Sequence, residues 1–302
     1  MNGQPGREAT AIRAERVSFS YTGDREVLDD VSLVIPRGQF VAFVGRNGSG
    51  KTTLVKHFNG SLRPARRDAV SRVSVYDAAG REHDTRRTPL HLLARVVGYV
   101  FQNPDRQTFM DTVRAELAFG LANIGVPPAE AAARMARALD LVQLAGLEPR
   151  NPFRLSRGQR QRVALAAVLV MEPDIIVVDE PTTGQDRRES RNILEILKEY
   201  NRRGRTVLIV THDMALVAEY SDRVIVMRDG RPVADGHPRA VFEDVESLRS
   251  SNITAPQVTE LGLRLGLGCT LRVSELTASL LARAGGKTGD PASRAGDSVA
   301  TR

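Results

Sequence analysis

The sequence predicts an α/β fold in which a mostly parallel β-sheet is connected by crossover helices. Apolar, β-rich runs such as DIIVVDEP and TVLIVTHD recur about thirty residues apart, with helical stretches between them. A glycine-rich loop, GRNGSGKTT, joins the apolar run QFVAFV to a helical stretch, and residues 110–150 have a helical composition. Parallel strands need long crossover connections, so this alternation indicates a parallel sheet.

The predicted elements follow in order along the chain. Residues 1–10 lack apolar periodicity and are expected to form a disordered lead. The runs IRAERVSFSY and VSLVIPRGQFVAFVG, within residues 11–44, predict strands separated by turns. TTLVKHFNGSL predicts a helix that ends at Asn59-Gly60, and VVGYVFQNP predicts a buried strand that enters a loop.

Composition indicates a soluble, intracellular chain. Of its 302 residues, 41% are hydrophobic and 26% are charged, as in ordinary globular proteins. The longest apolar run has about nine residues, far fewer than the ~20 that span a bilayer. No secretory signal is recognisable, and the lone Cys269 fits a reducing cytoplasm. The net charge of +7 comes mostly from arginines interleaved with acids, so no nucleic-acid partner is expected.

The loop GRNGSGKTT has the pattern of a phosphate-binding loop. Its two glycines, five positions apart and followed by Lys and Thr, allow backbone N–H groups to point at phosphate oxygens. Lys51 is expected to neutralise the β- and γ-phosphates, and the Thr52 hydroxyl to ligate Mg²⁺. The candidate nucleotide-binding residues of the loop are Gly45, Arg46, Asn47, Gly48, Ser49, Gly50, Lys51, Thr52 and Thr53.

Two adjacent acids end a later apolar run, DIIVVDEP. Asp179 is placed where it can hold Mg²⁺ or its water shell. Glu180 is expected to polarise a water aimed at the γ-phosphate, because successive side chains on a strand point in opposite directions. Acids at strand ends are usually only exposed, so this prediction depends on the phosphate-binding loop that precedes them.

Three further side chains gain meaning from the same arrangement. Gln102 follows an apolar strand and is expected to reach the Mg²⁺ and the attacking water. His212 follows another strand and is expected to contact the γ-phosphate. Tyr21 is a candidate aromatic residue on which the base of the nucleotide would stack. Each residue alone is more often structural than functional.

The stretch LSRGQRQRV begins with a turn and continues at once as a helix. The start of a helix can hold an anion, because its unpaired N–H groups and the positive end of its dipole point outward. The chain therefore contains two elements suited to binding phosphate.

Jointly these motifs resemble the nucleotide-binding subunits of ABC transporters, over about Ile12–Phe242. They occur in the family's order, with the aromatic loop at Tyr21, Walker A at Gly45–Thr53, the Q-loop at Gln102, the signature at Leu155–Gln159, Walker B at Ile175–Asp179, the D-loop at Thr183–Asp186 and the switch at His212. The resemblance implies a P-loop NTPase fold, with a RecA-like mixed-sheet core, an antiparallel β subdomain and a helical signature subdomain.

The resemblance also implies the domain organisation and the function. The nucleotide-binding domain is expected at 11–245, with its helical subdomain at about 108–170, a small C-terminal helical extension at 246–283 and a disordered tail at 284–302. ATP and Mg²⁺ are the implied cofactors. Two cassettes are expected to pack head to tail, so that Ser156, Gly158 and Gln159, together with Asp186, complete the nucleotide site of the second ATPase subunit, which is the same or a homologous chain.

Within the family, FQNPDRQTFMDTVRAELAFGLANIGVP is similar to the ATPases of energy-coupling factor importers, which take up vitamins and transition-metal ions. This similarity implies a transmembrane coupling subunit, a substrate-binding membrane subunit and a peripheral location on the cytoplasmic face of the cell membrane. Another ABC transporter class, a soluble ABC ATPase acting on nucleic acid and a small-molecule kinase are the alternatives.

Two residues depart from the commonest family pattern. Arg157 replaces the first glycine of the signature pair, and it would be strained if that position required a positive φ. Gln185 stands where many cassettes have a leucine before the D-loop aspartate.

Overall fold

The computed structural model describes residues 9–64 and 70–285. Its strands are β1 (Thr10–Phe19), β2 (Leu28–Pro36), β3 (Phe40–Val44), β4 (Arg72–Tyr76), β5 (Glu82–Asp84), β6 (Val97–Val100), β7 (Ile175–Asp179), β8 (Thr206–Val210), β9 (Arg223–Arg228) and β10 (Arg231–Gly236). Its helices are α1 (Lys51–Phe58), α2 (Leu90–Leu93), α3 (Val113–Asn123), α4 (Pro128–Leu141), α5 (Arg157–Leu169), α6 (Arg187–Arg202), α7 (Met214–Tyr220), α8 (Pro238–Glu243), α9 (Val245–Ser250), α10 (Gln257–Arg264) and α11 (Val273–Gly285).

Two sheets organise the fold. The larger has the strand order β10-β9-β3-β8-β7-β6, in which every neighbouring pair is parallel except β10 with β9. The smaller has the order β2-β1-β4-β5 and is antiparallel throughout. The α/β fold with a mixed core sheet and an antiparallel β subdomain is therefore confirmed.

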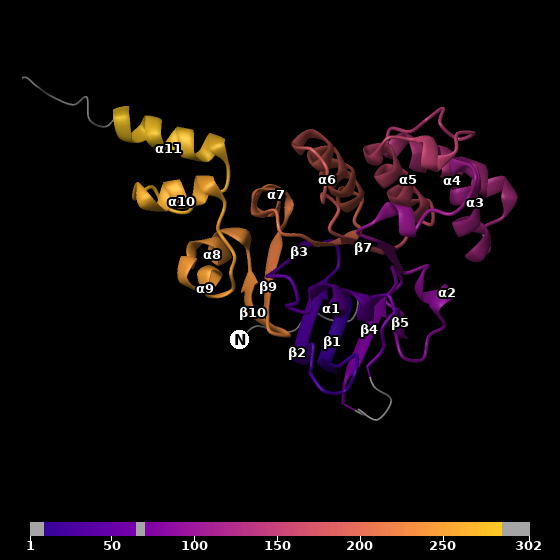
Figure 1. The fold of residues 1–302 in the computed structure, drawn as a ribbon, viewed down its shortest axis with the longest axis horizontal. Coiled ribbons are helices and arrows are strands. Elements are labelled where there is room, and N and C mark those ends of the chain that lie inside the picture. The colour runs from indigo at the N-terminus through magenta and orange to yellow at the C-terminus, as the bar shows by residue number, and fades with distance from the viewer. Residues whose placement is uncertain (1–8, 65–69, 286–302) are drawn as a thin grey trace, which may run out of the picture.

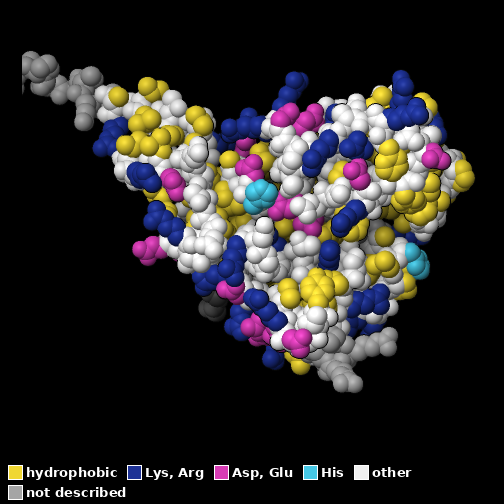
Figure 2. All heavy atoms as spheres, viewed as in Figure 1, with side chains coloured by type: hydrophobic (Ala, Val, Ile, Leu, Met, Phe, Trp, Pro, Cys, Tyr) yellow, Lys and Arg dark blue, Asp and Glu magenta, His cyan; other side chains and the backbone are white. Residues whose placement is uncertain are grey.

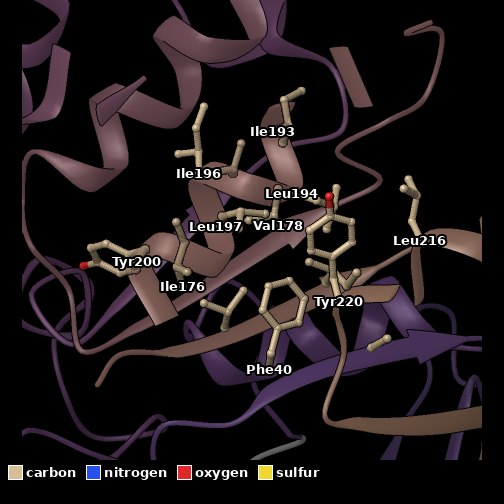
Figure 3. Close-up of a cluster of buried hydrophobic side chains, with 14 of the residues drawn as sticks. Phe40, Ile176, Val178, Ile193, Leu194, Ile196, Leu197, Tyr200, Leu216 and Tyr220 are labelled. Atoms are coloured by element: carbon tan, nitrogen blue, oxygen red, sulfur yellow. The ribbon is translucent and has the colours of Figure 1, made fainter. Parts of the chain in front are cut away.

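The central strands of the larger sheet are buried on both faces, as expected for parallel strands. Phe40 and Ala42 of β3 pack into one hydrophobic cluster, whereas Val41 and Phe43 pack into the other. The first cluster contains α6 and α7 (Figure 3), and the second lies between the two sheets and includes α1. This alternation explains why the strands are almost continuously apolar in the sequence.

Helices α3, α4 and α5 form a subdomain on one side of the molecule, and α8 to α11 form an extension on the opposite side (Figure 1). Helix α5 lies apart from α1, the helix that begins within the phosphate-binding loop (Figure 1). In the part of the chain that the structure describes, no helix is both long enough and apolar enough to cross a bilayer.

The ends of the domain differ slightly from the expected boundaries. Thr10, assigned to the disordered lead, is a buried residue of β1 that pairs with Pro36, so the ordered part begins earlier than expected. At the other end, α11 continues to Gly285, past the expected boundary at 283. The rest of the predicted lead and tail lies outside the described residues.

Candidate functional site

The loop between β3 and α1 can be built only with glycine at two positions. Gly45 has a φ of 149°, and an added Cβ would lie 2.3 Å from the carbonyl oxygen of Met227. Gly50 has a φ of 98°, and its Cβ would lie 2.8 Å from the carbonyl oxygen of Val27. The loop thus follows a path that excludes side chains, which leaves its backbone N–H groups accessible.

Lys51 lies inside this loop and is only 7% exposed. Its ammonium donates to the carbonyl oxygens of Gly45 at 2.8 Å and Arg46 at 2.9 Å. Burial lowers the pKa of Lys51, although the nearby carboxylates of Glu180 and Asp179 oppose this shift. The charge is therefore held at the centre of the loop, where a phosphate would neutralise it.

Thr52 and Asp179 provide two neighbouring oxygen atoms that could ligate a metal ion. The Thr52 hydroxyl donates to Oδ1 of Asp179 at 3.1 Å, and the Tyr99 hydroxyl donates to Oδ2 at 3.0 Å. Asp179 is 5% exposed, and burial raises its pKa while the two hydroxyl groups oppose the shift. A hydroxyl and one carboxylate fit Mg²⁺, which is usually held by one or two carboxylates together with substrate phosphates.

Glu180 follows β7 directly, but its side chain points to a different set of partners. Its backbone has a φ of 50°, a left-handed conformation that is uncommon for a residue other than glycine. Its Oε2 lies 2.8 Å from Nδ1 of His212 and accepts a hydrogen bond from the Thr183 hydroxyl at 3.2 Å. Strained backbone of this kind is typical of functional sites.

A cavity of about 850 Å³ joins most of the predicted residues. Tyr21 lies at its edge, where its hydroxyl is 3.2 Å from Oγ1 of Thr53, and Gln102 and Glu180 line it as well. The predicted site residues that line the cavity are Tyr21, Arg46, Asn47, Gly48, Gly50, Lys51, Thr52, Thr53, Gln102 and Glu180. Asp179 and His212 join this group through their bonds to Thr52 and Glu180.

The signature residues lie elsewhere. Among the described residues that line the cavity, none belongs to Leu155–Gln159. Ser156 is instead the N-cap of α5, where its hydroxyl accepts from the amide of Gln159 at 3.2 Å while the Gln159 side chain accepts from the Ser156 amide at 3.0 Å. This capping box orders the start of α5 and leaves it at the surface. Asp186 similarly caps α6 by accepting from the amides of Arg188 and Glu189.

The two departures from the family pattern fit this local structure. Arg157 is the first residue of α5 and does not have a positive φ, so the position does not require glycine. Its guanidinium donates to the carbonyl oxygen of Thr183 at 3.1 Å. The amide of Gln185 donates to the carbonyl oxygen of Thr182 at 3.1 Å, which forms the turn that leads to Asp186.

The contacts of three residues at the site could not be predicted from the sequence. Tyr99 lies in an ordinary apolar strand, and Thr183 lies in a turn, so neither carries a local signal for its bond to a carboxylate. Asp229 lines the cavity and pairs with Arg46 at 2.9 Å, across 183 residues of chain. Only the folded chain brings these side chains to the site.

Comparisons with known proteins agree with this geometry. A family model described as "ABC transporter" matches residues 28–183. The energy-coupling factor transporter ATP-binding protein EcfA1 of Caldanaerobacter subterraneus subsp. tengcongensis is 42% identical, over 85% of this chain and 91% of that protein. EcfA of Methanocaldococcus jannaschii is 39% identical, over 83% of this chain and 87% of that protein. The solved structure of cbiO1 from Clostridium perfringens, part of the ABC transporter complex cbiONQ, superimposes with a TM-score of 0.71 at 33% identity, covering 85% of this chain and 99% of that one.

Some relatives are considerably longer than this chain. The matched region is 43% of a putative ABC transporter ATP-binding protein of Caldanaerobacter subterraneus subsp. tengcongensis and 45% of one from Methanosarcina acetivorans. The family model nevertheless covers more than half of this chain, and its matched residues include the phosphate-binding loop and Glu180. The chain belongs to the ABC transporter family, and it is similar to the ATP-binding subunits of energy-coupling factor transporters.

Proposed function

We propose that this chain is the ATP-hydrolysing subunit of a membrane import complex of the energy-coupling factor type. The observation that carries the proposal is the division of the site. The phosphate-binding loop and Glu180 share one cavity, while the signature at the start of α5, where Ser156 is exposed, does not line it. A second cassette, of the same or a homologous chain, would supply the missing half.

The residues of the cavity suit ATP hydrolysis. Lys51 and the loop amides bind the phosphates, and Tyr21 offers its exposed ring to the base. Thr52 and Asp179 would hold Mg²⁺, with Gln102 near it, and the ion would neutralise charge on the β- and γ-phosphates. Glu180 orients a water for attack on the γ-phosphate and takes its proton, because Thr183 and His212 fix the carboxylate through Oε2 and neither bond uses Oε1.

The start of α5 provides the contacts that would close a head-to-tail pair. Ser156 and the amide of Gly158 would donate to the γ-phosphate bound by the partner subunit. Hydrogen bonds to a charged group contribute about 1.5–3 kcal/mol each, so a few of them favour the closed pair only while the γ-phosphate is present. Hydrolysis removes those contacts, and the pair opens.

Exposed aromatic side chains near Gln102 in the sequence fit a membrane partner. Phe101, Phe109 and Phe119 are 41%, 57% and 42% exposed, and the rings of Phe109 and Phe119 pack edge to face at 4.9 Å. Hydrophobic side chains gather over the helical subdomain on the visible face (Figure 2). We assign these side chains to contact with an apolar helix of the transmembrane coupling subunit, and we propose that the chain lies at the cytoplasmic face of the membrane.

The proposed cargo follows from similarity alone. The EcfA relatives and the cbiO1 neighbour support uptake of a vitamin or a transition-metal ion. In this arrangement the membrane subunits select the cargo, and a substrate-binding membrane subunit completes the complex.

Mixing two inactive variants tests the shared site. Lys51→Ala destroys the loop half of a site, and Ser156→Glu places a repelling carboxylate in the signature half. In a head-to-tail pair made of one chain of each kind, one site keeps an intact loop from one chain and an intact signature from the other. Random mixing therefore restores about a quarter of the wild-type ATPase rate per chain.

Each variant alone provides the control, since a pair of identical variants has no intact site. A mixture that stays as inactive as the separate variants, while the wild-type chain hydrolyses ATP under the same conditions, contradicts a site shared between two copies. Repeating the experiment with a homologous cassette in place of one of the two chains then distinguishes a partner of the same chain from a homologous partner. Co-purification of the tagged chain with a polytopic membrane protein tests the transport role.

A further inference from the structure

Arg157 joins the signature to the catalytic residues of its own chain. Its guanidinium donates to the carbonyl oxygen of Thr183 at 3.1 Å. It also lies against Gly184, where an added Cβ would be within 2.4–2.7 Å of three guanidinium atoms. Gly184 has a φ of 70°, so this turn both requires a glycine and provides the flat surface on which the guanidinium rests.

Thr183 connects this contact to the proposed base. While its carbonyl oxygen accepts from Arg157, its hydroxyl donates to Oε2 of Glu180 at 3.2 Å, and its amide donates to the Glu180 carbonyl oxygen at 3.3 Å. The same Oε2 lies 2.8 Å from Nδ1 of His212. One residue of the turn thus holds Glu180 on one side and is held by Arg157 on the other.

The same two segments touch again beside Arg157. An added Cβ at Gly158 would lie 3.0 Å from Oε2 of Glu189, near the start of α6. The start of α5 therefore packs closely against the turn 183–186 and the helix that follows it. A movement of the signature would be transmitted to this turn.

We propose that Arg157 is a positioning residue for ATP hydrolysis, which fixes Glu180 by holding the Thr183–Gly184 turn. The inference rests on the proposed function, in which the signature of one chain contacts the nucleotide of the other. The signature contacts the nucleotide bound by the partner subunit. Arg157 then links that nucleotide to Glu180, the proposed general base of its own chain. This link requires a long side chain with a hydrogen-bond donor at position 157, because a glycine there has no side chain to reach Thr183.

The test compares Arg157→Ala with Arg157→Lys, and uses Arg154→Ala as the matched control. Arg154 is an exposed arginine just before the signature, in the short helix Pro152–Arg154. We expect Arg157→Ala to lower kcat for ATP about threefold to tenfold, as for the loss of one hydrogen bond, with KM changed less than twofold. Lysine keeps a donor and should recover part of kcat, and Arg154→Ala should match the wild type.

A double-mutant cycle with Thr183→Val identifies the route. Valine removes the hydroxyl that reaches Glu180 but keeps the carbonyl oxygen that accepts from Arg157. If Arg157 acts through Thr183, the loss of kcat in the double variant is smaller than the product of the two single losses.

The proposal is wrong if kcat of Arg157→Ala equals that of the wild type, if only KM changes, or if the two losses multiply. A change confined to KM would place the guanidinium on the partner's nucleotide instead. Thermal unfolding of each variant shows whether kcat fell because the chain unfolded, and a loss of kcat that disappears when corrected for the folded fraction also overturns the role. A wild-type chain that stays inactive both alone and together with a homologous cassette would contradict the proposed function itself, whereas an active wild type with an unaffected Arg157→Ala contradicts only the inference.

Discussion

Nδ1 of His212 lies 2.8 Å from Oε2 of Glu180, so residues that follow two neighbouring parallel strands meet at one edge of the sheet. Because the carboxylate of Glu180 can only accept, Nδ1 carries the hydrogen in this pair. Glu180 keeps a left-handed backbone conformation at the same place. The base is thus fixed by its backbone and by its side-chain partners at once.

Replacement of Glu180 by glutamine separates binding from hydrolysis. We expect Glu180→Gln to bind ATP and to accumulate as a closed dimer, because the amide keeps the shape of the side chain but cannot take a proton from water. Size-exclusion chromatography with and without ATP and Mg²⁺ measures this. A variant that remains monomeric with ATP would be evidence against the proposed cycle.

Removal of the Lys51 ammonium should abolish ATP binding. Lys51→Ala eliminates the buried charge that the loop carbonyl oxygens of Gly45 and Arg46 now hold and that phosphates are expected to attract. Titration with a fluorescent ATP analogue measures the affinity. Lys198→Ala is the control, because that lysine pairs with Asp222 outside the cavity and should leave binding intact. Unchanged affinity in Lys51→Ala would refute the assignment of the loop.

The Tyr99 hydroxyl should contribute to stability through Asp179. Tyr99→Phe leaves Oδ2 of a buried carboxylate without its donor, which we expect to lower the free energy of unfolding by about 1–3 kcal/mol. Urea denaturation measures the change. In the Asp179→Asn background the same substitution should cost less, and an equal cost in both backgrounds would show that the hydroxyl acts on another group.

His57 should make stability sensitive to acid. Its ring is fully buried on α1, Nδ1 lies 2.7 Å from the Thr53 carbonyl oxygen, and Nε2 has no hydrogen-bond partner among the described residues. Burial lowers the pKa of His57 below its ordinary 6.5, against the opposing effect of the Thr53 carbonyl. Below about pH 6.5 the unfolded chain therefore binds a proton that the folded chain does not. The free energy of unfolding accordingly decreases as the pH is lowered.

Melting temperatures at pH 7.5 and 5.5 test this linkage. The fall in melting temperature should be smaller in His57→Gln than in the wild type, because the substituted chain has no such proton to bind when it unfolds. The exposed His91 offers the matched control, and the melting temperature of His91→Gln should fall as much as that of the wild type. An equal fall in all three chains would exclude His57 as the source.

Much of the fold and site could be predicted because the evidence for it is local. Walker B, expected at Ile175–Asp179, coincides with β7, and Asp179 and Glu180 face different partners. The glycines at 45 and 50 take positive-φ conformations that other residues rarely adopt. The lead ended earlier than expected because Thr10 is held by pairing with β2, which no local pattern shows.

By itself, the sequence determined the order of strands and helices, the phosphate-binding loop and the candidate acids, because these depend on residue types at short spacings. Tertiary structure alone decided that Tyr99 holds Asp179, that Arg157 reaches Thr183, and that the signature does not line the cavity of its own chain. The physical reason is distance along the chain. Tyr99 and Asp179 are separated by 80 residues and Arg157 and Thr183 by 26, so their contacts arise from packing of whole elements rather than from any local preference.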